Sequence, residues 1–71
     1  MMLTVKVRTG SGEPIIKDNM IIIFTEAKRE NGKANVDVIS QIKKLYNTES
    51  VTIKRGKTSS RKLIFVGIDD P

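Results

Sequence analysis

One segment of helical period, placed between two pairs of β-type segments, constrains this chain most strongly. Val38, Ile42 and Leu45 recur at spacings of four and three residues, which places them on one face of a helix. Ile39 and Tyr46 widen this apolar face. A helix with a single apolar face has to pack against another element, and the rest of the chain offers strands for this purpose. The pattern therefore predicts one helix that covers one face of a sheet.

The charges at both ends of this segment support the helix. Asp37 lies near its start, whereas Lys43 and Lys44 lie near its end, and each has the sign that the helix dipole favours. Asn47 follows and is suited to the left-handed conformation that often ends a helix.

Four other segments are interpreted as strands. Residues 3–8 and 51–54 alternate between apolar and polar side chains, as half-buried strands do. Residues 20–24 are a continuous apolar run, and residues 62–66 form the last strand. Ile15 and Ile16 are interpreted as an anchor within a turn-rich loop, and not as a strand.

The predicted order is β-β-α-β-β within a single domain, residues 1–71. We expect a two-layer α+β fold with a four-stranded mixed sheet and one helix on one face. If the strands that flank the helix are neighbours, they are parallel and joined by a right-handed crossover. The opposite face of the sheet would then carry a basic set of side chains, namely Thr4, Lys6, Arg8, Thr52 and Lys54.

The chain contains neither cysteine nor histidine. This excludes disulfides, thiol nucleophiles and a Ser-His-Asp arrangement, and it removes the usual ligands of zinc, haem and iron–sulfur clusters. We predict no metal site, no cofactor and no catalytic residue. An enzyme built from this chain would depend on carboxylates, Lys, Ser, Thr or Tyr, and the sequence places no carboxylate pair across a cleft.

The net charge is +5, which attracts anions or, alternatively, only aids solubility. The longest apolar run, Met20 to Phe24, is far shorter than a membrane span. We therefore expect a cytoplasmic monomer that does not enter a membrane. Tyr46 and Phe65 fit the core pattern, so no exposed aromatic platform for stacking bases is expected.

The first candidate site is the run from Asn31 to Asn35 at the expected start of the helix. Gly32 would allow a close backbone approach, Lys33 adds charge, and the unpaired N–H groups of a helix start can hold an anion. The alternative is structural: Asn31 or Asn35 caps the helix and Gly32 permits the turn.

The second candidate site is the segment 54–62, in which five of nine residues are basic. Gly56-Lys57-Thr58 resembles the end of a P-loop, but Val51 stands in place of the first glycine and a strand follows, which excludes nucleotide hydrolysis. A looser anion-binding loop remains possible, with a solvated hairpin as the alternative. Its candidate ligands, beyond Lys33 and Asn35, are Arg55, Lys57, Ser59, Arg61 and Lys62, with Gly56 as a structural turn residue.

The segment Gly32-Lys33-Ala34-Asn35, followed by the apolar helix, resembles the Asp/Asn-Gly-x-Ala-Asn motif of the YggU-like family of small proteins of unknown function. Gly56, Ser59 and Lys62 resemble its second motif, a glycine followed by hydroxyl and basic residues before the last strand. The resemblance covers most of the chain and implies a two-layer α+β domain with a β-β-α-β-β core.

Two positions depart from the family pattern. The family often has a Pro-Lys pair after the first strand, where this chain has Thr9-Gly10. The usual arginine of the second motif falls on Ser60, with Arg61 one position later. Roles that depend on these two basic side chains are not transferred to this chain.

The sequence is compatible with three functions. The first is a basic module that binds the phosphates of RNA or DNA, or another anion, through the basic sheet face and the loop 55–62. The second is an interaction or assembly factor that binds an unidentified protein through the helix start. The third is a small enzyme that acts on an anionic metabolite.

Overall fold

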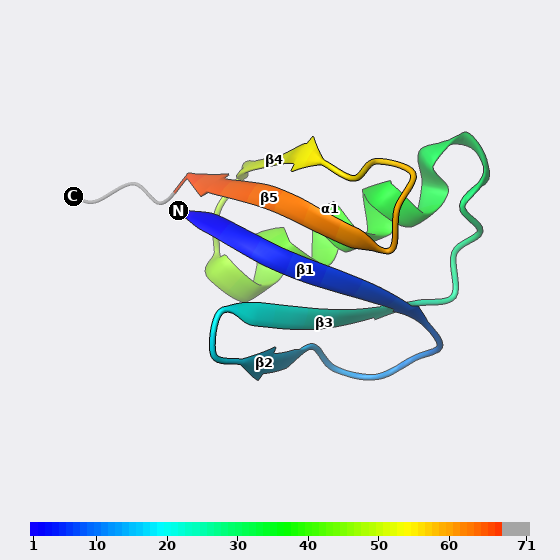
Figure 1. The fold of residues 1–71 in the computed structure, drawn as a ribbon, viewed down its shortest axis with the longest axis horizontal. Helices are drawn as coiled ribbons and strands as arrows, with labels where there is room; N and C mark the ends of the chain where they lie inside the picture. Colours follow the sequence, from blue (N-terminus) through cyan, green and yellow to red (C-terminus); the bar gives the residue numbers. More distant parts are fainter. Residues whose placement is uncertain (68–71) are drawn as a thin grey trace.

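A five-stranded mixed sheet and one α-helix form the two layers of the computed structural model, which describes residues 1–67 (Figure 1). The α+β class, with one helix on one sheet face, is confirmed, but the sheet has five strands where four were predicted. The elements are β1 (Met2–Thr9), β2 (Ile15–Lys17), β3 (Met20–Thr25), η1 (Glu30–Gly32), α1 (Lys33–Tyr46), β4 (Ser50–Arg55) and β5 (Arg61–Gly67).

The additional strand is β2, at one edge of the sheet. It pairs antiparallel with β3, to which it is joined through a turn at Asp18-Asn19, where Asp18 has a φ of 45°. Because β2 has only three residues, its sequence shows no period that would predict a strand. Ile15 and Ile16 are 41% and 59% exposed, as an edge position explains.

The strand order is β2-β3-β1-β5-β4. The strands that flank the helix, β3 and β4, are not neighbours, because β1 and β5 lie between them. The expected crossover between adjacent parallel strands is therefore not present. The sheet is mixed for a different reason: β1 and β3 pair in parallel, whereas the other three pairs are antiparallel.

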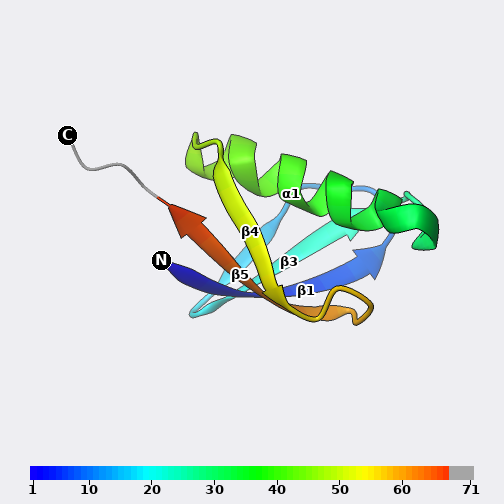
Figure 2. The same cartoon turned by 90° about the horizontal axis from the view of Figure 1, so that it is seen from above.

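The core lies between α1 and the sheet face that α1 covers (Figure 2). It consists almost entirely of β-branched side chains, which fit the pleated surface of a sheet. Its buried members are Val5, Val7, Ile21, Ile23, Val38, Ile42, Ile64 and Val66. Among residues 1–67, no helix or strand covers the opposite face of the sheet (Figure 2).

The buried stripe of α1 is displaced from the predicted one. Ala34, Val38 and Ile42 are buried, four residues apart on one row of the helix, whereas Leu45 is 40% exposed. Leu45 lies instead at the rim of a shallow depression next to Pro14. Its spacing from Ile42 is compatible with the core face, but α1 ends one residue later at Tyr46, which packs against the core in its place.

This displacement predicts unequal costs of truncation along the helix. Ile42→Ala removes a fully buried side chain and should lower the unfolding free energy by about 2–5 kcal/mol. Leu45→Ala removes a side chain that already contacts water and should cost about 1 kcal/mol or less. Urea denaturation of both variants measures the difference. Equal costs would mean that Leu45 belongs to the core.

Candidate functional site

Asn31 and Gly32 form a left-handed turn immediately before α1. Asn31 has φ 55° and ψ 28°, and Gly32 has φ 71° and ψ 12°. Asn and Gly are the residue types that adopt this conformation most readily. The Asn-Gly pair therefore sets the direction in which the chain enters the helix.

No side-chain hydrogen bond caps α1 within the described residues, so the prediction of a cap by Asn31 or Asn35 is wrong. Backbone carbonyls satisfy two of the free N–H groups at this end. Lys33 donates its N–H to the Glu30 carbonyl, and Ala34 donates to the Lys28 carbonyl at 3.0 Å. The helix start is therefore partly closed to an anion.

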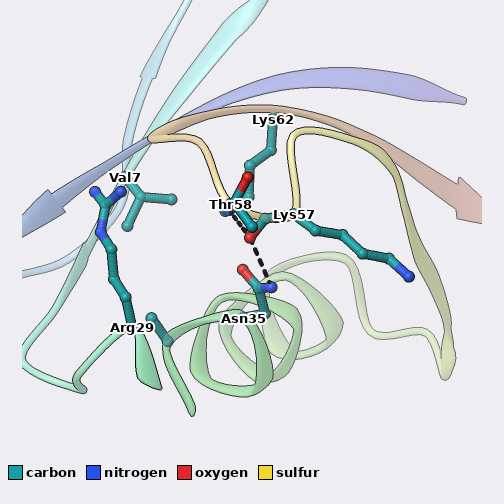
Figure 3. Close-up of a pocket in the computed structure, with 7 residues that line it drawn as sticks. Val7, Arg29, Asn35, Lys57, Thr58 and Lys62 are labelled. Carbon is teal, nitrogen blue, oxygen red and sulfur yellow. Dashed lines mark hydrogen bonds between the residues drawn. The ribbon is translucent and has the colours of Figure 1, made fainter. Parts of the chain in front are cut away.

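Asn35 joins the two predicted motifs. Its Nδ2 donates to the Lys57 carbonyl at 2.9 Å, across 22 residues of sequence (Figure 3). Lys57 belongs to the β4–β5 loop, residues 56–60. Asn35 therefore holds this loop against the first turn of α1 through one of the two N–H groups of its amide.

Lys62 holds the same loop from its other side. Only 5% of the residue is exposed, and its Nζ donates to three loop carbonyls, those of Gly56 at 2.8 Å, Lys57 at 3.2 Å and Ser59 at 2.7 Å. An ammonium group has three N–H donors, so all of them are used within the loop. Lys62 is consequently a loop-fastening residue and not a surface ligand.

Burial also changes the acidity of this ammonium group. Desolvation lowers the pKa of Lys62 below its ordinary value, and the positive charge of Arg29 lowers that pKa further. The charge persists without a carboxylate partner, because the loop carbonyls provide acceptors for it.

A small cavity lies between the first turn of α1 and the β4–β5 loop. Its volume is about 90 Å³, well below the roughly 300–1,000 Å³ of typical small-molecule sites, although it has room for a few water molecules. Figure 3 shows Arg29 across the cavity from Lys57, whose side chain points away from it. The lining residues are Val7, Arg29, Ala34, Asn35, Lys57, Thr58 and Lys62.

The cavity unites only part of the predicted set. It brings together Asn35, Lys57 and Lys62, whereas the exposed side chains of the other candidates lie outside it, namely Lys33, Arg55, Ser59 and Arg61. Arg29 and Val7 were missed by sequence reasoning, whereas Thr58 belongs to the predicted segment 54–62. No local pattern marks them, because the cavity is assembled from separate segments of the chain.

The uncovered face of the sheet holds a second and larger group of basic residues. β1, β4 and β5 each carry two Lys or Arg residues and β2 carries one, which makes seven, and the five strands contain neither Asp nor Glu. Lys62 is buried and lies on the core side of β5, which leaves six of the seven for the uncovered face. Along β1, Lys6 and Arg8 alternate with the buried Val5 and Val7, which places both basic side chains on the uncovered face.

Lys6 lies directly opposite Arg61 in the antiparallel β1–β5 pair. Met1 and Val66 exchange both backbone hydrogen bonds, at 2.9 and 2.7 Å. Met1 and Val66 are therefore a hydrogen-bonded pair, and such pairs alternate along antiparallel strands with pairs that share no hydrogen bond. By this alternation Lys6 and Arg61 share no backbone hydrogen bond. In pairs of this kind the Cα atoms lie about 4.5 Å apart. Two positively charged side chains thus leave the sheet from directly opposite positions, an arrangement that is in general destabilising.

No carboxylate compensates this pair within the described part of the chain. The single ion pair among residues 1–67 joins Lys43 and Glu49, at 3.7 Å and on another part of the molecule. The acidic residues of that range lie in loops, in η1 or in α1. The uncovered face therefore presents positive charge without internal neutralisation.

Apolar side chains separate these basic groups. Leu63 and Phe65 alternate with the buried Lys62, Ile64 and Val66, so both lie on the uncovered face, half-buried. The prediction that Phe65 belongs to the core is therefore wrong. Its ring lies 5.8 Å from the Nζ of Lys54, measured to the ring centroid.

Phe24 and Ile22 reach the same face from β3, where Ile21, Ile23 and Thr25 are the buried residues. A signal for this arrangement was present in the sequence. A continuous apolar run in a sheet covered on one side necessarily places every second residue on the other side.

Two further kinds of feature are absent from residues 1–67. No helix there is long and apolar enough to cross a membrane. No group of three or more Asp or Glu side chains in that range is arranged to hold a metal ion.

Comparisons of the chain with protein-family models, with curated proteins and with solved structures find no match. The function has to be inferred from the residues themselves.

The loop geometry predicts that two similar glycines differ in their tolerance of alanine. Gly32 (φ +71°) and Gly56 (φ +84°) both strain any other residue, but a Cβ at Gly32 meets nothing within 4 Å. A Cβ at Gly56 would collide with the Arg61 carbonyl oxygen. Gly32→Ala should cost about 1 kcal/mol of unfolding free energy and Gly56→Ala clearly more. Equal melting temperatures for the two variants would contradict this loop geometry.

The lowered pKa of Lys62 predicts a pH-dependent contribution to stability. Between its folded-state pKa and the unfolded value of about 10.4, the unfolded chain holds a proton that the folded chain has lost. The contribution of Lys62 to the unfolding free energy therefore rises with pH through this window. Below the window the ammonium group is charged in both states, and the folded protein bears the full cost of its desolvation. The difference in unfolding free energy between wild type and Lys62→Met should shift in favour of wild type from pH 7 to pH 10.

The matched control is Lys57→Met, which removes an exposed lysine from the same loop. The pH-dependent change should be larger for Lys62→Met than for this control, because Lys62 is buried and Lys57 is exposed. A Lys62 difference that is flat, or that moves against wild type as pH rises, would exclude a lowered pKa.

Proposed function

We propose that this protein binds nucleic acid through its phosphates, using the uncovered face of the sheet. The observation that supports this most directly is the pair of like charges, Lys6 opposite Arg61, with no carboxylate near it among residues 1–67. Such a pair costs stability in the free protein, and an anion between the two side chains removes that cost.

A polyanion suits this face better than a single small anion. Arg8 lies two residues from Lys6 along β1, and Lys54 lies farther along the face on β4, so the positive groups are distributed over several strands. A chain of phosphates can neutralise several such groups at once and releases counterions as it does so. A backbone contact of this kind positions the nucleic acid without selecting a sequence.

The β4–β5 loop contributes its outer side chains and not its interior. Asn35 and Lys62 use their donors to hold the loop, and the enclosed cavity is too small for a nucleotide. Arg55, Lys57 and Arg61 are exposed and extend the positive surface at this end. Membership of the YggU-like family stays a prediction, and the proposal does not depend on it.

Removing the opposed pair should weaken binding. The double variant Lys6→Gln and Arg61→Gln should lower the affinity for a fluorescent oligonucleotide by about tenfold or more in 50 mM salt. Its slope of log affinity against log salt should fall by about 1.4, because each lost phosphate contact removes about 0.7 for a single strand. Fluorescence anisotropy at several salt concentrations measures both quantities.

The matched control is Lys28→Gln with Lys44→Gln, which removes the same charge from exposed positions outside the sheet. This control should bind nearly as wild type does. Equal losses in the two double variants would mean that net charge alone attracts the oligonucleotide. Absence of binding by wild type in low salt would refute the proposed function.

A further inference from the structure

We infer that the nucleic acid is single-stranded and that one of its bases stacks on Phe65. This inference rests on the proposed function and makes it more specific. Phosphate contacts alone would be served by any basic surface, but this face also exposes apolar side chains between its positive groups. A ligand complementary to this face would carry both anionic groups and flat apolar groups.

Phe65 occupies a suitable place on the sheet. It lies on β5, opposite Met2 of β1 and Thr52 of β4, and therefore between two strands and not at an edge. Its ring is half-buried, and the Nζ of Lys54 lies 5.8 Å from the ring centroid. A cation–π contact at an exposed site is worth only about 0.5–1 kcal/mol, so a base can displace this ammonium, which then remains close enough for a phosphate.

The ring and the charged pair belong to one track. Arg61 and Phe65 are four residues apart on β5, which places them about 14 Å apart along the strand, on the same face. Leu63 and its partner Thr4 lie between them. An unpaired strand that follows β1 and β5 therefore meets positive side chains at one end of the track and an aromatic ring at the other.

A duplex does not match this surface. Its bases are stacked inside, so it would set phosphates and sugars against Leu63 and Phe65, or leave these side chains in water. The major groove admits a helix or a two-stranded ribbon, but not the face of a five-stranded sheet. Unpaired bases, in contrast, stack on aromatic rings without regard to sequence, and the gain is about 1–3 kcal/mol for each base.

Phe24 provides an internal comparison. It lies on the same face, but the segment around Gly10 and Gly12 packs on its ring, so that a Cβ atom added to these glycines would lie 3.9 and 3.6 Å from the nearest ring carbon. Its ring is thus in contact with the segment that follows β1. The ring of Phe65 has instead its own strand beside it, where a Cβ atom added to Gly67 would lie 3.5 Å away, and the Nζ of the exposed Lys54 5.8 Å from its centroid. Replacing each phenylalanine by leucine therefore distinguishes the loss of base stacking at Phe65 from the general effect of removing an aromatic side chain.

The test uses four fluorescent probes of equal length in 50 mM salt: oligo(dT), oligo(U), an abasic oligodeoxynucleotide and a DNA duplex. Wild type should bind oligo(dT) or oligo(U) about tenfold more tightly than the abasic strand, and also more tightly than the duplex. Phe65→Leu should abolish this preference and leave the affinity for the abasic strand unchanged. Phe24→Leu should retain the preference.

Two results would overturn the inference while the proposed function stands. One is equal affinity of wild type for the abasic and the unpaired strands. The other is a Phe65→Leu variant that folds normally by circular dichroism and keeps the full preference for bases. If none of the four probes binds, or if poly-glutamate binds as tightly as oligo(dT), the proposed function itself fails.

Discussion

Among residues 1–67, a single α-helix of fourteen residues covers one face of a sheet of five strands. At a rise of about 1.5 Å per residue, α1 is about 21 Å long and packs along one sheet face. Within residues 1–67 no second helix packs on the other face of the sheet. The uncovered face follows from this arrangement, because a single helix packs on only one side of the sheet.

The beginning of β5 connects these two faces. Arg61 points to the uncovered face, opposite Lys6, whereas the next residue, Lys62, points inward and holds three carbonyls of the β4–β5 loop. A compact ammonium group suits acceptors that converge from several directions, which a planar guanidinium does not. Asn35 fastens the same loop to α1. The loop therefore fixes where β5 begins, and so which side chains reach the positive face.

Local patterns in the sequence were sufficient for the fold class, for the helix and for the sign of charge on the sheet face. They were insufficient where a site depends on a contact between residues that are far apart in the sequence. Asn35 and Lys57 are 22 residues apart, so neither the loop contact nor the cavity could be predicted from either motif alone. Leu63 and Phe65 belong to an apolar run whose sequence does not distinguish inside from outside. Their orientation is set by the strand's alternation with Lys62, which lies on the core side of β5.

The account is tested most directly by mapping the contact surface in solution. Nuclear magnetic resonance of the labelled protein, titrated with unlabelled oligo(dT) in low salt, reports each affected residue. The predicted shifts are largest on the uncovered face, at Lys6, Arg61 and Phe65, and small at Lys33 and in the cavity beside Asn35. Shifts concentrated around that cavity and the start of α1, with an unperturbed sheet face, would contradict the account.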